Sequence, residues 1–308
     1  MIHTRVLIAL VAVAALVLGV PVGAQEGRRL IESRESPYNN IYVHQNGTYF
    51  SMMFGHNRTL YTESVYNSLD DRELPVTYTR LMTVSLAYPR KINSILEIGF
   101  GGGRTAWYLH RFLPGVRITS VELDPTVVEL ARKYFGIKNE PNFEVVNKDG
   151  RLFLAQSKTR YDVILIDAYR GPFVPFHLLT REFYQIVKDH LAEGGVVAQN
   201  VEPSTMLFDA AAKTMSAVFP QVEFYAADGN VVTVAYPGAT RTPEELERVA
   251  AERQASLRLR YELKPMLEGR KPLVAGTIDP AAKMLTDDFA PVESLKAIEK
   301  HNRKWPDK

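Results

Sequence analysis

The chain has 308 residues, of which 46% are hydrophobic and 23% are charged, so it can bury one large core with an accessory unit and lacks the composition of a disordered protein. The net charge is only +2, and the Lys and Arg residues are too dispersed to form a basic stripe, so nucleic acid is not an expected partner. Cysteine is absent, which excludes disulfides, thiolate metal sites and a cysteine nucleophile, and no metal site is expected.

The first 24 residues have the pattern of a secretory signal peptide. Residues 1–5 form a short basic segment, residues 6–20 form an uncharged apolar run, and small residues precede Gln25. A membrane span needs about 20 apolar residues, so an anchor formed by an uncleaved N-terminal helix is the alternative. The sequence therefore predicts an exported protein, periplasmic or extracellular, although nucleoside cofactors are made in the cytosol.

Residues 35–75 contain short alternating runs that are typical of strands, within 41–44, 48–54 and 59–65. The turn sequences Asn46-Gly47 and His56-Asn57 separate these runs. We predict a small antiparallel β domain, whose tyrosines either line a substrate cleft or are ordinary strand residues. A helix over 78–87 is expected to lead into the next unit.

Residues 76–237 alternate between strand and helix patterns, as a parallel sheet covered on both faces requires. Strands are expected at 94–99, 117–122, 143–147, 161–167, 195–200, 222–226 and 231–235, and helices at 125–135 and 204–219. Seven strands, with the last two close together, favour an α/β fold with a Rossmann-like, class I methyltransferase-type sheet over the six-stranded dinucleotide fold.

The first of these strands ends in a glycine-rich turn, LEIGFGGGR over 96–104. Glycines at Gly99, Gly101, Gly102 and Gly103 would let the backbone turn sharply and approach a ligand. Glu122 closes the next strand 19 residues after Gly103, where an open α/β sheet places a carboxylate for ribose hydroxyls. The third glycine of the dinucleotide fingerprint is replaced by Arg104, so a nucleoside is favoured over NAD or FAD.

Two further acids close predicted strands. Asp149 is followed by Gly150, a pair that is common in turns but also one that suits an adenine amino group at a strand end. Asp167 ends a very apolar strand, where a carboxylate either caps a helix or takes part in catalysis. Since neighbouring parallel strands end at one edge, we interpret Glu122, Asp149 and Asp167 as parts of one site.

Residues 238–308 form a charged C-terminal extension. Thr242 and Glu245 make a capping box with an intervening proline, and this opens a helix to about residue 260. The tail from Lys264 is expected to be irregular except over 285–293, where Asp287 and Asp288 precede an aromatic residue and a capped turn is the simpler interpretation.

Six segments together resemble the spermidine/spermine synthase (polyamine aminopropyltransferase) superfamily, with this chain as a divergent, exported member. They are SPYNNI (36–41), LEIGFGGG (96–103), VELD (121–124), KDGRLFL (148–154), YDVILID (161–167) and VAQN (197–200). The resemblance runs from about residue 36 to 236 and implies a small β domain before a Rossmann-like catalytic domain, often in a homodimer. It also implies decarboxylated S-adenosylmethionine as co-substrate and methylthioadenosine as product.

The resemblance implies a role for each site residue. Glu122 would hold the ribose, Asp149 and Gly150 the adenine, and the glycines of 99–103 the amino acid side of the nucleoside. Asp167 would face the reacting amine. Asn39, Tyr78 and Gln199 would contribute to the substrate side of the pocket.

The departures from the family pattern are also informative. The family has a second acid three residues after the position of Asp167, which accepts a proton from the amine, and here that position is Arg170. Asn39 replaces a family Gln, and Arg80 and Val84 stand where the family has Glu and His. Segment 167–180, with 286–289, instead resembles non-standard members that are often joined to transporter-like membrane segments.

The sequence leaves three hypotheses open for function. They are an aminopropyltransferase acting on an amine, a methyltransferase-like enzyme using S-adenosylmethionine, and a non-catalytic exported nucleoside-binding protein. Arginine is no base and repels a cation, so we expect Arg170 to turn the pocket toward neutral or acidic ligands. The sequence offers only Asp287 or Asp288 as a replacement base.

Overall fold

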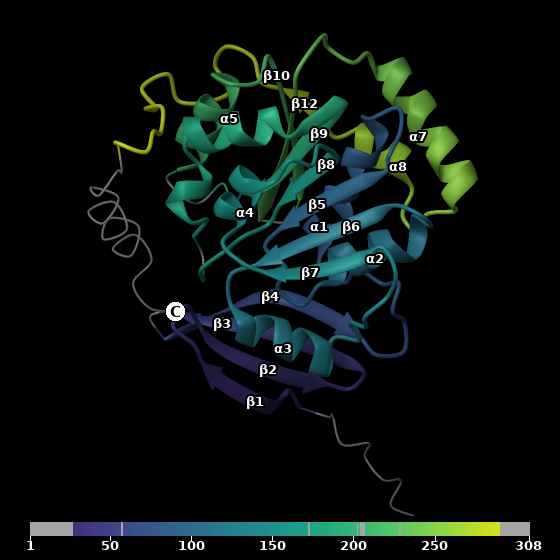
Figure 1. Cartoon of the computed structure of the whole chain (residues 1–308), viewed down its shortest axis with the longest axis vertical. Coiled ribbons are helices and arrows are strands. Elements are labelled where there is room, and N and C mark those ends of the chain that lie inside the picture. Colours follow the sequence, from purple (N-terminus) through teal and green to yellow (C-terminus); the bar gives the residue numbers. More distant parts are fainter. Residues whose placement is uncertain are drawn as a thin grey trace, which may run out of the picture.

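The computed structural model describes residues 27–56, 58–171, 173–201, 203, 207–227 and 229–289, and these residues form two β-sheets with flanking helices (Figure 1). The predicted signal peptide, residues 1–24, lies outside this part of the chain. None of the helices in the described ranges is both long and apolar enough to cross a membrane.

The N-terminal sheet consists of four antiparallel strands in chain order. They are β1 (Arg29–Glu35), β2 (Asn40–Asn46), β3 (Tyr49–His56) and β4 (Thr59–Asn67). The predicted alternation is present on β2, because Ile41 and Val43 are buried while their strand neighbours are at least partly exposed, whereas three successive residues of β3, 52–54, are buried. We did not expect β1, whose sequence RLIESRE is charged and mostly exposed, as suits an edge strand.

The larger sheet has the strand order β12-β10-β11-β9-β8-β5-β6-β7. Its bounds are β5 (Ser94–Ile98), β6 (Arg117–Glu122), β7 (Phe143–Asn147), β8 (Tyr161–Ile166), β9 (Leu191–Val201), β10 (Gln221–Ala227), β11 (Asn230–Tyr236) and β12 (Arg270–Pro272). Strands β5 to β9 pair in parallel, whereas β10, β11 and β12 pair antiparallel. All seven predicted strands are present, and the predicted methyltransferase-type fold is confirmed, with β12 as an unexpected eighth strand.

Helices cover both faces of this sheet. They are α1 (Thr77–Met82) with the 3-10 turn η1 (Thr83–Ala87), α2 (Arg104–Phe112), α3 (Pro125–Tyr134), α4 (Gly150–Gln156), η2 (Phe176–Leu178), α5 (Arg181–Asp189), α6 (Phe208–Ser216), α7 (Pro243–Leu257) and α8 (Leu263–Leu267). Ile95 and Val163 face one core, which includes residues of η1, α2, α3, α7 and α8. Leu96 and Ile164 face the other, formed with α4, α5 and α6.

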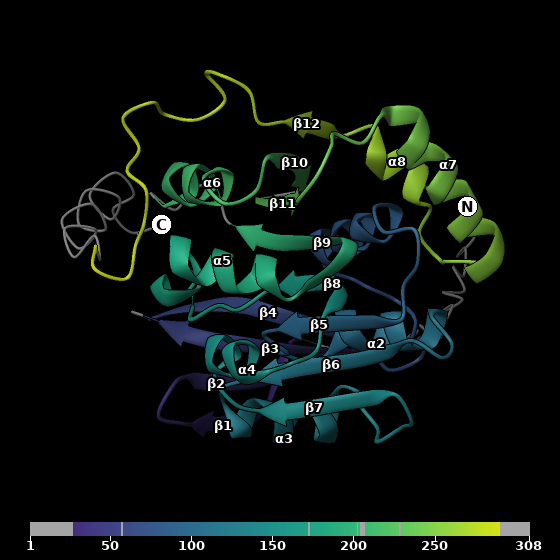
Figure 2. The same cartoon turned by 45° about the horizontal axis from the view of Figure 1, so that its top comes forward.

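The C-terminal extension is more ordered than the sequence predicted. The capping box of α7 is confirmed, with Thr242 and Glu245 exchanging side-chain and backbone hydrogen bonds of 3.1 and 3.2 Å. The expectation of an irregular tail from residue 264 is wrong, because α8 packs on α7 and β12 adds to the sheet edge beside β10. Figure 2 shows α7 and α8 together at one end of the molecule, and the chain after β12 running back past α6.

Candidate active site

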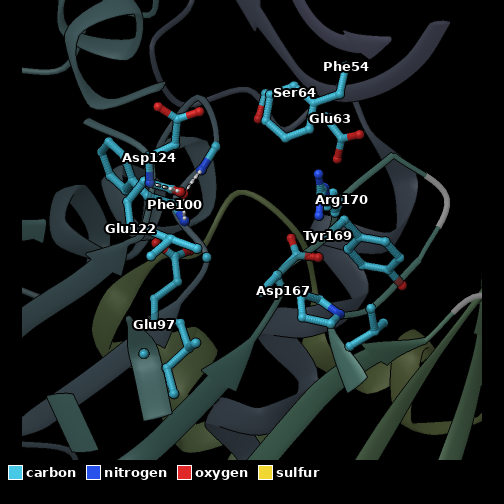
Figure 3. Close-up of a pocket in the computed structure, with 18 of the residues that line it drawn as sticks. Phe54, Glu63, Ser64, Glu97, Phe100, Glu122, Asp124, Asp167, Tyr169 and Arg170 are labelled. Atoms are coloured by element: carbon cyan, nitrogen blue, oxygen red, sulfur yellow. Dashed lines mark hydrogen bonds between the residues drawn. The ribbon is translucent and has the colours of Figure 1, made fainter. Parts of the chain in front are cut away.

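A cavity of about 870 Å³ lies where the carboxyl ends of β5, β6 and β8 meet the N-terminal sheet. Open parallel sheets bind their ligands at this edge, and the volume is within the range of small-molecule sites. Figure 3 shows acids from both sheets around this space: Glu122 and Asp167 from the larger sheet and Glu63 from the smaller one.

Gly99 forms the turn that brings the strand end of β5 to the cavity. Its φ is +92°, and a Cβ added there would lie 2.2 Å from the backbone oxygen of Asp167. Only glycine fits this position, because the left-handed backbone and the contact with the end of β8 both exclude a side chain. Close packing of the two strand ends thus fixes Asp167 beside the glycine-rich turn.

The remaining glycines of the turn divide into two groups. Gly101, with φ +51°, lines the cavity as predicted from the sequence. Gly102 and Gly103 do not line it: added Cβ atoms would lie 2.7 Å from side-chain atoms of Phe135 and 2.3 Å from the Phe100 ring. Gly102 and Gly103 therefore serve packing inside the protein, and of the four glycines predicted to contact a ligand only Gly99 and Gly101 lie on the cavity wall.

Arg104, which replaces the fingerprint glycine, joins the two sheets. Its guanidinium donates a 2.9 Å hydrogen bond to the backbone oxygen of Phe135 and lies 4.5 Å from the ring centre of Tyr66 on β4. The side chain is 4% exposed, and burial lowers its pKa to about 10. A dinucleotide-type glycine here would remove this bridge between α2 and the N-terminal sheet.

Glu122 is held rigidly at the end of β6. Its Oε2 accepts hydrogen bonds from the backbone N–H groups of Phe100 (2.9 Å) and Gly101 (3.2 Å), and its Oε1 accepts one from Asp124 (3.0 Å) (Figure 3). Burial raises the pKa of Glu122, and these three backbone groups partly offset that rise. Of about four lone-pair positions on a carboxylate, the three bonds leave one on Oε1, enough for one strong hydrogen bond from a ligand hydroxyl.

Asn39 lines the cavity next to this carboxylate, as the resemblance implied. Its amide donates to Asp124 at 3.3 Å, and Asp124 also accepts a 2.5 Å hydrogen bond from Ser36 while capping α3 through Thr126 at 2.9 Å. Part of the hydrogen-bonding capacity of Asn39 is therefore used in joining β2 to the start of α3.

Asp149 and Gly150 also lie on the cavity wall. One oxygen of Asp149 caps α4 through the backbone N–H of Leu152 at 2.8 Å, and the other lies 3.0 Å from Nε2 of His177. An added Cβ on Gly150 would lie 2.3 Å from the side chain of Ile98, so this glycine lets α4 approach β5. Asp149 therefore caps α4 and also lies on the cavity wall, where the sequence left open a turn residue or a residue for an adenine amino group.

Asp167 reaches the cavity from the end of β8. Its Oδ1 accepts a 2.9 Å hydrogen bond from the amide of Asn200, and the Tyr78 hydroxyl also hydrogen-bonds the carboxylate. Burial raises the pKa of Asp167 to about 6, against the lowering effect of these two hydrogen bonds. A carboxylate with a pKa near 6 is largely ionised at neutral pH and can still accept a proton.

Glu63 is a cavity residue that our sequence analysis did not single out. Its Oε1 is buried without a hydrogen-bond partner among the described residues. Burial, followed by the negative charges of Asp167 and Glu122, raises the pKa of Glu63 well above its usual value. The carboxyl group thus faces the same space as Asp167, from the opposite sheet (Figure 3).

Two sequence predictions place residues in the cavity that the structure puts elsewhere. Gln199 on β9 is fully buried, accepts a 2.8 Å hydrogen bond from Tyr184 and donates to the oxygen of Leu178 at 3.4 Å, and it does not line the cavity. Asp287 and Asp288 do not line it either, and Asp287 pairs with Arg151 outside it. Neither of these two acids occupies the position of a replacement base.

Arg170 lies at the exposed rim of the cavity. Within the described part of the chain, no ion pair involves it. Six acids line the cavity, against Arg104 and Arg170: they are Glu63, Glu97, Glu122, Asp124, Asp149 and Asp167. Carboxyl groups thus outnumber cationic groups in the lining, which suits a cation better than the neutral or acidic ligands that we expected.

The described residues contain no group of three or more His, Asp or Glu side chains arranged to hold a metal ion.

Comparison with known proteins identifies the family to which this chain belongs. Residues 77–236 match the model of the spermine/spermidine synthase domain. The polyamine aminopropyltransferase of Vibrio vulnificus is 28% identical over 279 residues, covering 87% of this chain and 91% of that protein. A probable polyamine aminopropyl transferase of Bifidobacterium longum is 33% identical over 248 residues, covering 74% of this chain and 54% of the relative.

Comparison with solved structures shows that the fold is shared with spermidine synthase. A crystal structure of spermidine synthase in complex with the transition-state analogue AdoDATO matches with a TM-score of 0.62 and 24% identity, over 78% of this chain and 82% of that one. At this identity the likeness establishes the fold, namely a small antiparallel sheet joined to a methyltransferase-like mixed sheet.

Proposed function

Because this chain belongs to the spermine/spermidine synthase family, we propose that it transfers an aminopropyl group from decarboxylated S-adenosylmethionine to an amine bound in the cavity. The observation that carries the proposal is the arrangement of two carboxylates in one cavity, at the ends of the parallel strands β6 and β8 that flank β5. Glu122 suits a ribose hydroxyl, and Asp167 suits an ammonium group.

The nucleoside end of the cavity is the part bordered by Glu122 and the glycine-rich turn. Glu122 has one free lone-pair position, and Gly99 and Gly101 give a ligand access to the backbone. Asp149 lies on the same wall, and its carboxylate can accept a hydrogen bond from an adenine amino group beside the contact that it makes with His177. These groups fit decarboxylated S-adenosylmethionine, which would supply a carbon activated by a sulfonium.

The amine end is the part around Asp167. An aliphatic amine is protonated at neutral pH, so it must lose a proton before its lone pair can attack. Asp167 is placed to orient the ammonium and to accept that proton, because its pKa of about 6 lies near the working range. The nitrogen then forms the new C–N bond, the C–S bond breaks with its electron pair going to sulfur, and methylthioadenosine leaves.

Turnover tests this proposal directly. The full chain is incubated with decarboxylated S-adenosylmethionine and putrescine, spermidine or cadaverine, and release of methylthioadenosine is measured. We expect release that requires both substrates and falls by at least 100-fold in Asp167→Asn, which cannot accept the proton. Methylthioadenosine binding without turnover would favour a non-catalytic binding protein, and methyl transfer from S-adenosylmethionine would favour the methyltransferase-like alternative.

A further inference from the structure

Glu63 occupies an irregular position in its strand. Met52 pairs with Ser64 and Met53 pairs with Thr62, so the register shifts at this point and Glu63 is the extra residue on β4. A bulge of this kind breaks the alternation of side chains and commonly re-aims one of them beside an active site. Here it accompanies a carboxyl group that reaches the cavity (Figure 3).

The surroundings of Glu63 leave one oxygen of its carboxyl group without a hydrogen-bond partner among the described residues. This oxygen, Oε1, is buried, and after burial the negative charges of Asp167 and Glu122 raise the pKa of the group further. Burying an unpaired acid next to other acids costs free energy, so an uncompensated group of this kind in a cavity requires an explanation. A bound cation would supply both the missing hydrogen bond and the missing positive charge.

The walls near this acid suit an organic cation more than a bare ion. The aromatic and apolar side chains on the same cavity include Phe54, Leu74, Tyr78, Tyr169 and Phe173. Tyr78 is close enough to interact electrostatically with both Glu63 and Asp167. Aromatic faces attract ammonium groups, while apolar walls pack against methylene chains.

We propose that Glu63 binds the ammonium group of the acceptor amine from the N-terminal sheet, opposite Asp167. The inference rests on the proposed function and deepens it, because it assigns the second carboxylate of the amine end to β4. In this chain Arg170 stands three residues after Asp167, so no acid is available there. The acceptor is then a cationic aliphatic amine held between two carboxyl groups from different sheets.

A competing explanation is that Glu63 serves Arg170. Figure 3 shows both side chains beside the same space, and a small movement of the exposed arginine would bring a guanidinium to the acid. In that case Glu63 would have a structural partner, and amine binding would not depend on it. The variants below separate the two explanations.

The test measures amine binding apart from nucleoside binding. Calorimetry gives the affinity of methylthioadenosine for the parent, and then that of putrescine for the protein saturated with methylthioadenosine. For Glu63→Gln we expect putrescine affinity to fall by about tenfold or more, with methylthioadenosine affinity unchanged. The control Glu144→Gln removes one exposed acid on β7, outside the cavity, and should change neither affinity.

Proton release gives a second readout that a purely structural role would not move. The titratable and charged groups that line this cavity are Tyr38, His56, Glu63, Tyr78, Glu97, Arg104, Glu122, Asp124, Asp149, Asp167, Tyr169, Arg170 and His177. An ammonium beside Glu63 favours its ionised form, so putrescine binding should release protons, measured in buffers of different ionisation enthalpy. We expect Glu63→Gln to release fewer protons per putrescine than the parent.

Each outcome bears on a different claim. Equal putrescine affinity in Glu63→Gln and the parent would overturn this inference alone, as would a parent that binds methylthioadenosine but no amine. Tighter putrescine binding in Arg170→Ala would support the inference if it is lost when Glu63→Gln is added, since Arg170→Ala removes a cation that competes for Glu63. A parent that binds no nucleoside would overturn the proposed function, and with it the inference.

Discussion

Arg151 on α4 binds Asp287 through two parallel hydrogen bonds, 2.7 Å from Nη1 to Oδ1 and 2.5 Å from Nη2 to Oδ2. The same guanidinium donates to the backbone oxygen of His177 at 3.1 Å. The hydrogen bonds from Arg151 lower the pKa of Asp287, so the carboxylate stays ionised and engaged. The pair fastens the C-terminal segment to α4, which covers one face of the larger sheet.

This pairing predicts that Asp287→Asn retains catalysis. Turnover with decarboxylated S-adenosylmethionine and putrescine should stay within about threefold of the parent, because Asp287 does not line the cavity. The side chain is 42% exposed, so the free energy of unfolding should fall by no more than about 1 kcal/mol. Asp288→Asn is the matched control, and a hundredfold loss of turnover in a folded Asp287→Asn protein would instead make Asp287 the base.

The sequence predicted the larger sheet because its strands are apolar runs that end at glycines or acids. Those runs are long enough to be buried on both faces, and β5 and β8 are fully buried as expected. The strands β1 and β12 were missed for the opposite reason. They are short or charged edge strands, whose pairing depends on neighbours far along the chain.

The site was predictable where a strand end sets the position of a side chain. Glu122, Asp149 and Asp167 close three such strands and line one cavity. Glu63 was not predictable, because alternation along β4 gives no sign of a one-residue register shift. Gln199 was misplaced for a related reason, since its face of β9 is decided by contacts with α5 rather than by the motif around it.

Replacing Glu122 tests the nucleoside end. Glu122→Ala should weaken methylthioadenosine binding by about tenfold or more, because a charge-assisted hydrogen bond to a hydroxyl is worth roughly 1.5 to 3 kcal/mol. Calorimetry measures the affinity, and thermal unfolding checks that the turn at Phe100 and Gly101 survives the loss of its acceptor. Unchanged affinity in a folded variant would remove Glu122 from the binding site.

We also propose that residues 1–24 are removed during export. The basic start, the apolar run and the small residues before Gln25 motivate this prediction. Amino-terminal sequencing or intact mass measurement of protein from its native compartment should find a chain that begins near residue 25. Recovery of most of the protein with Met1 in place would favour an N-terminal anchor.

Gly99→Ala should be strongly destabilising. The substitution combines a left-handed backbone with a Cβ placed 2.2 Å from the oxygen of Asp167, so the ends of β5 and β8 must separate. Gly115→Ala is the matched control, because Gly115 has φ +82° but no atom within 4 Å of an added Cβ. In urea unfolding, the free energy of unfolding should fall by about 1 kcal/mol in the control and by clearly more in Gly99→Ala. Equal losses would show that small backbone shifts remove the collision at little cost in free energy.

Glu97→Gln should make the free energy of unfolding less dependent on pH. Burial raises the pKa of Glu97 from its ordinary value of 4.5 to about 8, so between these values the folded state keeps a proton that the unfolded state has lost. The stability contributed by this group is therefore complete below pH 4.5 and is lost as the pH rises toward 8.

Glutamine imitates the protonated acid, since its amide can keep the 2.7 Å hydrogen bond with Ser120 without ionising. Near pH 4.5 the variant and the parent should have similar free energies of unfolding. Above that pH the variant should become more stable than the parent by up to about 1.4 kcal/mol per pH unit, because the parent releases the Glu97 proton on unfolding and the variant has no such proton to release. Urea unfolding at pH 5, 6 and 7 measures the difference directly. Since Glu63, Glu122 and Asp167 titrate in both proteins, parallel stability curves for parent and variant would show that Glu97 is ionised in the folded state.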